Sequence, residues 1–459
     1  MAPASLAVLA AGCAGVDPQP VFDSLRVDLA GRSGIEATWP RDAEASAAAD
    51  AELRQLLEGE LDADRATRIA LLRNRDLLAG LEELGIGQAE LAQATRIANP
   101  KLELSRRTAS GGGGSQVEVG LAVELLDGLI APRRRKLAEI ELEALRLRTA
   151  RLLQTTVADT RIAVAELQAT LKKLEGLVLL RDLDASAAEI AKRQHAAGNV
   201  NDRELARHEL RANQSQVALT KARLEARQAR EVLQRQMGLS GPELGWKLAA
   251  DWPQKSAREI SGDNLEQLAE EQRYDLAAAR AGLDLVGRAL ALKKGMRYFP
   301  LGVEVGVSTE KEPDGSRLTG PTLVLELPIF DTGKAGVAKL EAEERKARRQ
   351  LEGLTLEARS QVREAWDALR AARQLADFHQ RVLLPQQAFV VDQTLRHHNM
   401  MLEGVFELIE ARKEEAEEQI AAAESERDYW IARARLELAL GGRLPAPPPE
   451  PAAAEGGSP

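Results

Sequence analysis

Two histidines and two methionines near residue 400 are the most conspicuous chemically active side chains of the sequence. His397 and His398 lie beside Met400 and Met401, and imidazole and thioether groups are ligands that soft transition metals such as copper prefer. On a helix, His397 would share a face with Met400 and Met401. Packing and solvation at a turn are the commoner use of such residues, so we assign no metal ligands here.

The rest of the sequence offers no catalytic or cofactor-binding motif. The other histidines, His195, His208 and His379, are isolated from one another. No Ser-His-Asp elbow and no zinc signature is present. The four glycines at residues 111–114 could cradle a phosphate, but no Lys-Ser or Lys-Thr pair follows them, and a hairpin loop explains them better. We therefore predict neither an enzyme nor a bound cofactor.

The composition narrows the class of protein further. The chain has 459 residues, of which 44% are hydrophobic and only 3% aromatic, and its net charge of -9 gives no basic face for nucleic acid. A single cysteine, Cys13, excludes an internal disulfide framework. No run of 18 or more residues is free of charge and apolar, which excludes an ordinary transmembrane helix. A membrane role would therefore need a lipid anchor or a barrel.

The N-terminus carries the features of a secretory leader. Residues 6–11 form a short apolar run that fits the h-region of a signal peptide. Residues 9–13, Leu-Ala-Ala-Gly-Cys, resemble a bacterial lipobox, which predicts cleavage before Cys13 and lipidation of its thiol. Ala14 carries no acidic inner-membrane retention signal, which in the lipobox resemblance implies sorting to the outer membrane. An ordinary leader without lipidation remains the alternative.

The chain contains one internal duplication. Residues 74–77 (Asn-Arg-Asp-Leu) return as residues 273–276 (Arg-Tyr-Asp-Leu), an offset of 199. Residues 203–205 return as residues 406–408, an offset of 203. A single repeat over roughly 200 residues indicates a duplicated domain rather than a solenoid of short repeats. Both halves should therefore share one fold.

Each half carries two strand-like runs. Apolar residues alternate with small, polar or acidic ones, at a period of two, in residues 116–125, 301–308 and 323–329 and more weakly in 101–105. We predict β-hairpins at residues 100–126 and 300–330, with Glu312-Pro313-Asp314-Gly315 as the second loop.

Long helices follow each hairpin. Heptad spacing, typical of a coiled-coil seam, continues through Leu153, Val157, Thr160, Val164, Leu167, Leu171, Leu174 and Val178, and again through Leu351, Leu354, Ala358, Val362, Ala365, Leu369 and Ala372. The first helix should run from about Arg133 to about Ala197. Pro385 should break or kink its counterpart. Helical-hairpin tips are predicted near residues 198–204 and 399–407.

These elements define the predicted organisation. In chain order the segments are a signal peptide with lipobox (1–13), a tether and equatorial segment (14–60), the first repeat (61–240), a linker (241–262), the second repeat (263–442) and a disordered tail (443–459). Four strands cannot close a barrel alone, because the smallest membrane barrels need about eight. The strand edges must therefore meet copies of the same chain.

The predicted fold class is an α+β membrane protein with two internal repeats. The alternating strands beside the long helices predict a shared β-barrel, to which each protomer contributes four strands, that continues into a long α-helical coiled-coil barrel. A periplasmic coiled-coil structural or adaptor protein without a barrel is the alternative, since helices alone would suffice for it. The period-two alternation in both halves favours the protein with a β-barrel over the coiled-coil protein without one.

The second hairpin carries a family resemblance. Residues 320–333 (GPTLVLELPIFDTG), with Asp275-Leu276 and Pro300 as further landmarks, resemble the TolC family of outer-membrane efflux proteins over roughly residues 50–441. The resemblance implies a homotrimer with a 12-stranded barrel in outer-membrane lipid and a helical tunnel across the periplasm. It also implies a passive exit duct that receives substrate from an inner-membrane pump through a periplasmic adaptor.

The resemblance also suggests functional positions. Aligning the turn at His398 with the family's tip places Glu407 and Glu410 where acidic residues narrow the periplasmic aperture. This chain departs from the family in having Glu in place of Asp, and Met401 in place of the tip glycine. The adaptor would dock at the hairpin tips, on Gly198, Asn199, Val200, Gly404 and Val405.

Two further features are left open by the sequence. The segment from His398 to Leu408 resembles family branches associated with heavy-metal resistance, while small organic substrates remain plausible. Arg133, Arg134, Arg135 and Lys136 follow the second strand and could meet lipid phosphates at the periplasmic rim of a barrel. A solvated helix start explains the same four cations.

Overall fold

The computed structural model describes residues 16–108, 115–255, 262–297, 302–326 and 329–445. The chain forms two compact units. The strand unit comprises Met1–Leu25, Leu81–Ala150 and Tyr274–Leu356, and the helical unit comprises Arg26–Gly80, Arg151–Arg273 and Glu357–Pro459. Within the described ranges, no helix has the length and apolar character needed to cross a membrane.

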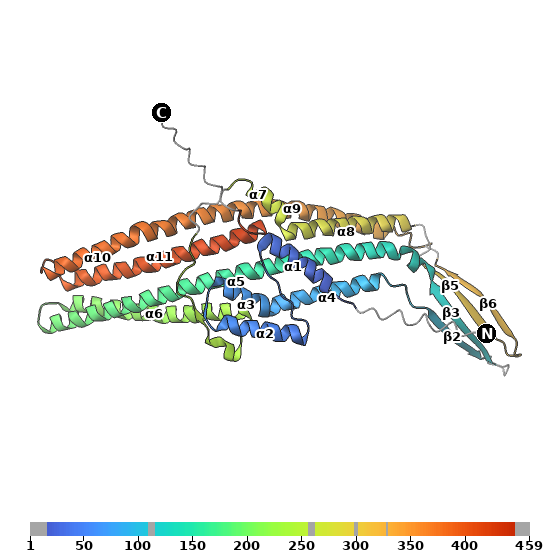
Figure 1. Cartoon of the computed structure of the whole chain (residues 1–459), viewed down its shortest axis with the longest axis horizontal. Coiled ribbons are helices and arrows are strands. Elements are labelled where there is room, and N and C mark those ends of the chain that lie inside the picture. Colours follow the sequence, from blue (N-terminus) through green and yellow to red (C-terminus); the bar gives the residue numbers. More distant parts are fainter. Residues whose placement is uncertain (1–15, 109–114, 256–261, 298–301, 327–328, 446–459) are drawn as a thin grey trace, which may run out of the picture. The chain divides into compact units, whose positions relative to one another are not determined.

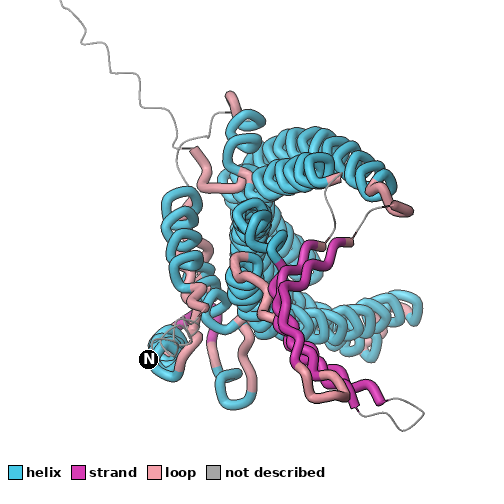
Figure 2. The backbone as a smooth tube through the Cα atoms, turned by 90° about the vertical axis from the view of Figure 1, so that its right-hand side faces the viewer, coloured by secondary structure: helices cyan, strands magenta, loops and turns pink. Residues whose placement is uncertain are grey.

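The strand unit contains one antiparallel sheet. Its strands are β2 (Lys101–Thr108), β3 (Ser115–Glu124), β5 (Val303–Lys311) and β6 (Arg317–Leu325), hydrogen-bonded in the order β2-β3-β5-β6. Figure 2 shows the four strands side by side in magenta. The turn between β5 and β6 contains Gly315 at a φ of 89°, a left-handed conformation that glycine adopts without steric cost. The two hairpins pair with each other through β3 and β5.

Besides the first part of α1 (Gln19–Ser33), the described residues of this unit include one complete helix and parts of three others. They are α8 (Tyr274–Met296) and parts of α4 (Arg75–Ala94), α5 (Leu125–Ala196) and α9 (Lys334–Phe378). α5 begins directly at the end of β3, so the expected start near Arg133 was about two turns too late. Pro132 lies inside the helix as its eighth residue. The helix begins earlier because the alternating pattern already ends at Glu124, and a proline is tolerated in the interior of this helix as well as at its first position.

The helical unit holds most of the remaining elements (Figure 1). Those complete within it are α2 (Ala43–Leu57), β1 (Glu60–Leu61), α3 (Ala63–Arg73), α6 (Asp202–Met237), the 3₁₀ turn η2 (Gly241–Gly245), β4 (Lys247–Leu248), α7 (Leu265–Gln272), the π-helical turn η3 (His379–Leu383), α10 (Leu384–Asn399) and α11 (Val405–Leu440). β1 and β4 pair in parallel. α1 (Gln19–Ser33) contributes residues to both units.

The duplication is visible in the matched ends of these helices. α6 and α11 both contain 36 residues, and they begin 203 residues apart. Each ends at a glycine in the left-handed conformation, Gly238 and Gly441. A Cβ at Gly238 would lie 2.1 Å from the backbone oxygen of Arg73, and one at Gly441 would lie 2.8 Å from the Cα of Arg273. Only glycine therefore fits the close approach that ends each helix.

Matched side chains support these two junctions. The buried Asn74 donates through Nδ2 to the backbone oxygen of Gln236 at 2.8 Å, near the end of α6. The buried Arg273 donates through Nη1 to the backbone oxygen of Ala439 at 3.3 Å, near the end of α11. Different side chains thus satisfy equivalent C-terminal carbonyls in the two repeats, which helix ends leave without intrahelical partners.

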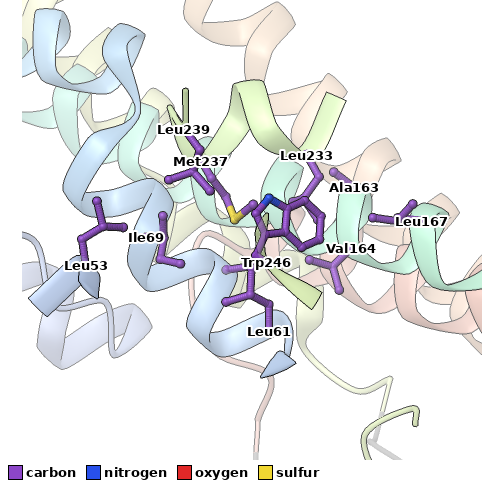
Figure 3. Packing of buried hydrophobic residues seen from close by; sticks show 11 residues of the cluster. Leu53, Leu61, Ile69, Ala163, Val164, Leu167, Leu233, Met237, Leu239 and Trp246 are labelled. Atoms are coloured by element: carbon purple, nitrogen blue, oxygen red, sulfur yellow. The ribbon is translucent and has the colours of Figure 1, made fainter. Parts of the chain in front are cut away.

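A hydrophobic core joins α5, α6, α3 and the β1–β4 pair. Figure 3 shows Trp246 packed among Leu61, Val164 and Met237. The first five residues of the predicted coiled-coil seam on α5 are buried: Leu153, Val157, Thr160, Val164 and Leu167. Thr160 is accommodated because its hydroxyl donates to the backbone oxygen of Thr156 at 2.7 Å. The later seam residues Leu171, Leu174 and Val178 are only half-buried.

The helix preceding Pro385 changes its geometry. α9 ends at Phe378, and the π-helical turn η3 precedes α10, whose first turn contains Pro385. Leu384 donates its backbone N–H to the oxygen of His379, five residues earlier. A proline lacks an N–H and its ring clashes with the carbonyl four residues before it, here that of Arg381. The wider turn relieves this clash without ending the helical path.

Candidate functional site

The sheet of the strand unit has two chemically different faces. In an antiparallel sheet, directly paired residues lie on the same face. Leu102, Leu121, Val307 and Pro321 form one such row across the four strands. The neighbouring rows on this face are also mainly apolar, and its larger side chains are exposed, including Leu102 at 64% and Leu323 at 60%. This apolar face has no described protein cover.

The opposite face carries the acidic and small residues. Its rows contain Glu103, Gly120, Ser308 and Gly320, then Ser105, Glu118, Glu310 and Leu318. Glu124 and Glu304 are paired on it as well. All five glutamates within the four strands are on this polar face. Lys101 forms an ion pair with Glu304, and Gln116 donates to Glu310. The surface therefore suits water and cations rather than lipid.

The first predicted hairpin tip lies between α5 and α6. α5 ends at Ala196 and α6 begins at Asp202, and Gly198 has a φ of 76°. The N–H of Gly198 donates to His195 and that of Asn199 to Gln194, at 2.8 and 2.9 Å. This is the Schellman arrangement, which satisfies the last carbonyls of a helix. Asn201 then caps α6 by accepting from the N–H of Glu204 at 3.0 Å.

The second tip, between α10 and α11, repeats this arrangement with a methionine. The N–H of Met401 donates to His398 and that of Leu402 to His397, both at 2.9 Å. Met401 has a φ of 60°, where glycine is normally found. Its side chain is 93% exposed, and the flanking Met400 and Leu402 are exposed as well. The tip therefore combines backbone strain with an exposed apolar surface. Gly404 and Val405 follow as the N-cap and first residue of α11.

Glu407 and Glu410 occupy different surroundings on α11. Glu407 lies in the first turn, where the helix dipole favours a negative charge. Its carboxylate lies so close to Gly404 that a Cβ there would be 2.7 Å from Oε2. Glu410 forms ion pairs with Lys413, at 3.5 Å, and with Arg211 of α6, at 3.4 Å. The two carboxylates therefore differ in their local counter-charges.

Lys413 connects α11 to α5. Its Nζ lies 3.0 Å from Oδ1 of Asp184, and the two side chains are only 12% and 10% exposed. A largely buried ion pair is costly to break by removing one partner, because the other charge is left without compensation. Together with the contact between Arg211 and Glu410, this pair ties the hairpin of α5 and α6 to α11.

His208 of α6 adds an aromatic contact to the same place. Its ring stacks on that of Phe406, with centroids 4.6 Å apart. Burial, followed by the nearby Arg211, lowers the pKa of His208 below its ordinary value, so the neutral form is favoured. The ion pairs and the ring stack border a pocket of about 240 Å³ that Asp184, His208, Phe406, Glu407 and Lys413 help to line.

Sequence reasoning missed most of this cluster. Asp184, Arg211 and Lys413 carry no local signal, since charged residues are common on long helices. In the sequence His208 is isolated from the other histidines, whereas in the structure its ring stacks on Phe406. The repeat offset gives no signal for the ring contact either, because His208 lies six residues after the start of α6 and Phe406 lies one residue after the start of α11.

The histidines of the second tip have protein partners. Nδ1 of His397 lies 3.2 Å from Oε1 of Glu403, and Nδ1 of His398 lies 3.1 Å from the backbone oxygen of the same residue. Within the described ranges, no group of three or more His, Cys, Asp or Glu side chains is arranged to hold a metal ion. The histidines therefore contribute to the turn itself.

The remaining predicted positions are on other parts of the chain. Cys13, the four glycines and Pro300 lie outside the described residues. In the cation cluster on α5, Arg134 pairs with Asp127 at 3.1 Å, whereas Arg135 and Lys136 both pair with Glu139. These pairs are internal to α5, and because α5 already begins at Leu125 the cluster lies within the helix and not at its start.

Comparisons with solved structures identify the fold. The Campylobacter jejuni CmeC outer membrane channel aligns with a TM-score of 0.70 at 14% identity, over 89% of each chain. A membrane protein from Pseudomonas aeruginosa aligns at 0.69 with 19% identity, covering 88% of this chain and 94% of its own. The outer membrane protein VceC from Vibrio cholerae gives 0.66 at 15% identity, covering 89% and 100%. No protein-family model matches the chain, and no curated protein sequence matches it.

These alignments cover nearly the whole chain and both of its repeats. The chain therefore has the fold of outer-membrane channels, with the long helices that the resemblance to the TolC family predicts. The solved structures aligned here are described as membrane proteins or channels and none as an enzyme.

Proposed function

We propose that a chain with this fold is the outer-membrane channel component of a tripartite efflux system, and a member of the TolC family. In this proposal three copies associate, and their four-stranded sheets together supply a 12-stranded barrel. The helical parts lie in the periplasm. The channel is a passive duct for substrate delivered by an inner-membrane pump through a periplasmic adaptor.

The two-faced sheet is the observation that carries this proposal. An exposed apolar face suits lipid, and an acidic face on the same strands suits a water-filled lumen. β2 and β6 are the outer strands of the sheet and each has one edge without a described partner strand. In lipid every unsatisfied backbone group costs several kcal/mol, so these edges need partners from neighbouring copies. A coiled-coil adaptor without a barrel has no use for such a sheet.

The helical unit supplies the proposed docking and gating positions. The adaptor docks at the two tips, at Gly198, Asn199, Val200, Gly404 and Val405. Glu407 and Glu410 narrow the aperture, where three copies bring six carboxylates to one axis. Such a ring attracts cations and is destabilised by its own like charges. The ion pairs of Glu410 and Lys413 would help to hold it closed. The segment from His398 to Leu408 resembles family branches associated with heavy-metal resistance, so the substrate classes of this proposal are heavy-metal ions and, as the alternative, small organic compounds.

The domain plan and the anchor belong to the same proposal. A signal peptide (1–13) precedes a tether (14–60), two repeats (61–240 and 263–442) joined by a linker (241–262), and a tail (443–459). Cys13 becomes the lipidated N-terminus in the periplasmic leaflet, where each buried methylene contributes about 0.8 kcal/mol of anchoring. Mass spectrometry of the mature N-terminus checks this assignment, because an unmodified thiol or cleavage elsewhere contradicts it.

The central experiment is purification of the full chain from membranes, followed by light scattering and planar-bilayer recording. We expect a trimer that is heat-modifiable on gels and conducts ions with a preference for cations. A soluble monomer without conductance would instead support the adaptor alternative. Replacing Cys13 by Ala should weaken anchoring but leave the trimer and its conductance intact.

A further inference from the structure

Three cations lie in one row on the apolar face of the sheet. Arg106 of β2 pairs with Val117 of β3, which pairs with Lys311 of β5, which in turn pairs with Arg317 of β6. Paired residues share a face, so these side chains project on the same side as Leu102 and Leu121. All three cations are exposed. This cation row is the last complete four-strand row before the hairpin loops.

The row carries an uncompensated charge. None of the five glutamates of the four strands lies on this face, because each is paired in a row of the polar face. Glu312 and Asp314 belong to the turn beyond Lys311, and Asp314 accepts hydrogen bonds from Ser316. Lys311 and Arg317 are directly opposite each other, an arrangement of like charges that destabilises a sheet unless an anion lies between them.

The position of the row matches the headgroup level of a membrane. Leu325 and Arg317 are eight residues apart on β6, which corresponds to roughly 27 Å along the strand. With a strand tilt of about 40°, the height is about 20 Å, comparable to the apolar band of an outer-membrane barrel at about 25 Å. Apolar rows facing acyl chains would thus end at cations facing phosphates.

We propose that Arg106, Lys311 and Arg317 bind an outer-leaflet lipid whose headgroup carries more than one phosphate. Neighbouring strands are about 4.8 Å apart, so Lys311 and Arg317 can hold one phosphate together while Arg106, about 10 Å from Lys311, holds a second. A headgroup with one phosphate would leave one of these positions without an anion. This inference rests on the proposed outer-membrane function, because it places the apolar face of the sheet in lipid.

Lipid retention by the purified full-length protein tests the inference. The probes are bisphosphorylated lipid A, its dephosphorylated form and phosphatidylglycerol, each counted on the protein by native mass spectrometry in detergent. The wild-type protein should bind bisphosphorylated lipid A at least tenfold more tightly than either other lipid. The triple variant Arg106→Gln, Lys311→Gln and Arg317→Gln should lose at least tenfold in this affinity.

A variant of the opposite face provides the control. Lys101→Gln combined with Arg107→Gln removes the two cations of the polar face, and Arg107 is the immediate neighbour of Arg106 in β2. This variant should bind bisphosphorylated lipid A as the wild type does. Equal binding by the triple variant and the wild type, or equal binding of phosphatidylglycerol and lipid A, would overturn the inference.

Bilayer conductance separates this inference from the proposed function. If the triple variant conducts as a trimer and still retains lipid A like the wild type, only the lipid site is wrong. If the wild-type protein neither forms a trimer nor conducts, the proposed function fails and the lipid site fails with it. A triple variant that conducts as a trimer but retains less lipid A supports both the lipid site and the proposed function.

Discussion

At the scale of single residues, the two hairpin tips show how one backbone arrangement is built from different side chains. Gly198 and Met401 occupy equivalent positions in two Schellman turns, with φ values of 76° and 60°. A glycine adopts this left-handed conformation without a steric clash, whereas the Cβ of any other residue destabilises the folded state by about 1 kcal/mol or more. Retaining Met401 therefore costs stability, and its exposed side chain is available to a docking partner.

Replacing Met401 by Gly should stabilise the protein. The free energy gained by relieving the strained φ exceeds the free energy lost because glycine makes the unfolded chain more flexible. The free energy of unfolding should therefore rise by about 0.5 kcal/mol or more. The reciprocal change Gly198→Met should destabilise it by about 1 kcal/mol. Thermal unfolding followed by circular dichroism at one scan rate measures both shifts. A lower melting temperature for Met401→Gly would mean that the methionine side chain makes stabilising contacts.

The buried pair of Lys413 and Asp184 makes a second residue-scale prediction. Lys413→Met should cost about 3 kcal/mol, because it leaves the Asp184 carboxylate buried without its counter-charge. Adding Asp184→Leu to this variant should restore most of the loss, since neither charge then needs compensation. Denaturant unfolding of the two variants and the wild type gives the comparison. If the double variant is no more stable than Lys413→Met, the pair is not the source of the effect.

At the scale of elements, the contact of α6 with α11 is sensitive to acid. The neutral His208 ring stacks on Phe406, and protonation would add a cation beside Arg207, Arg211 and Lys413. Because burial lowers the pKa of His208 in the folded state, the unfolded chain binds more protons as the pH falls below about 6.5. The contribution of His208 to stability is therefore present above that pH and is lost on acidification through the folded-state pKa.

We expect amide hydrogen exchange at the start of α11 to accelerate when the pH falls from 7.5 to 5.5, after correction for intrinsic exchange. His208→Phe keeps an aromatic stack and should remove most of this acceleration. His195→Gln serves as the control, because His195 lies on α5 beside Asp202 and makes no ring contact with Phe406. A pH response that persists unchanged in His208→Phe would assign the effect to another group.

At the scale of the whole molecule, carboxylates occur both on the polar face of the sheet and near the second tip. The five glutamates of the strands and the carboxylates of Glu407 and Glu410 all favour cations. Carboxylates that face a water-filled path attract cations.

Replacing both Glu407 and Glu410 by Ala should raise single-channel conductance in planar bilayers or reduce cation selectivity. The variant removes like charges from the aperture and also releases Arg211 and Lys413 from Glu410. Glu414→Ala with Glu417→Ala has the same spacing seven residues further along α11 and should change both quantities less. If conductance and selectivity both stay at wild-type values, these two residues do not form the gate.

Local periodicity was enough to predict much of this fold. Alternation at a period of two predicted strands at residues 101–105 and 301–308, and the structure has strands from Lys101 to Thr108 and from Val303 to Lys311, because side chains of a strand alternate between its faces. The predicted run at residues 323–329 overlaps only the end of β6. Heptad spacing identified Leu153, Val164 and Leu167 as buried. The start of α5 was wrong by about two turns, since a proline near a helix start does not itself set the first residue.

Long-range partners were beyond the reach of such patterns. Periodicity shows which face a residue occupies, but it does not show that Val117 pairs with Lys311, or that Asp184 meets Lys413 across more than 200 residues. Those partners depend on how the two repeats pack, which is a property of the whole folded chain. The amino-acid sequence by itself therefore determined the repeats, the strands and the long helices, and only the tertiary structure brought the three cations of the apolar face into one row.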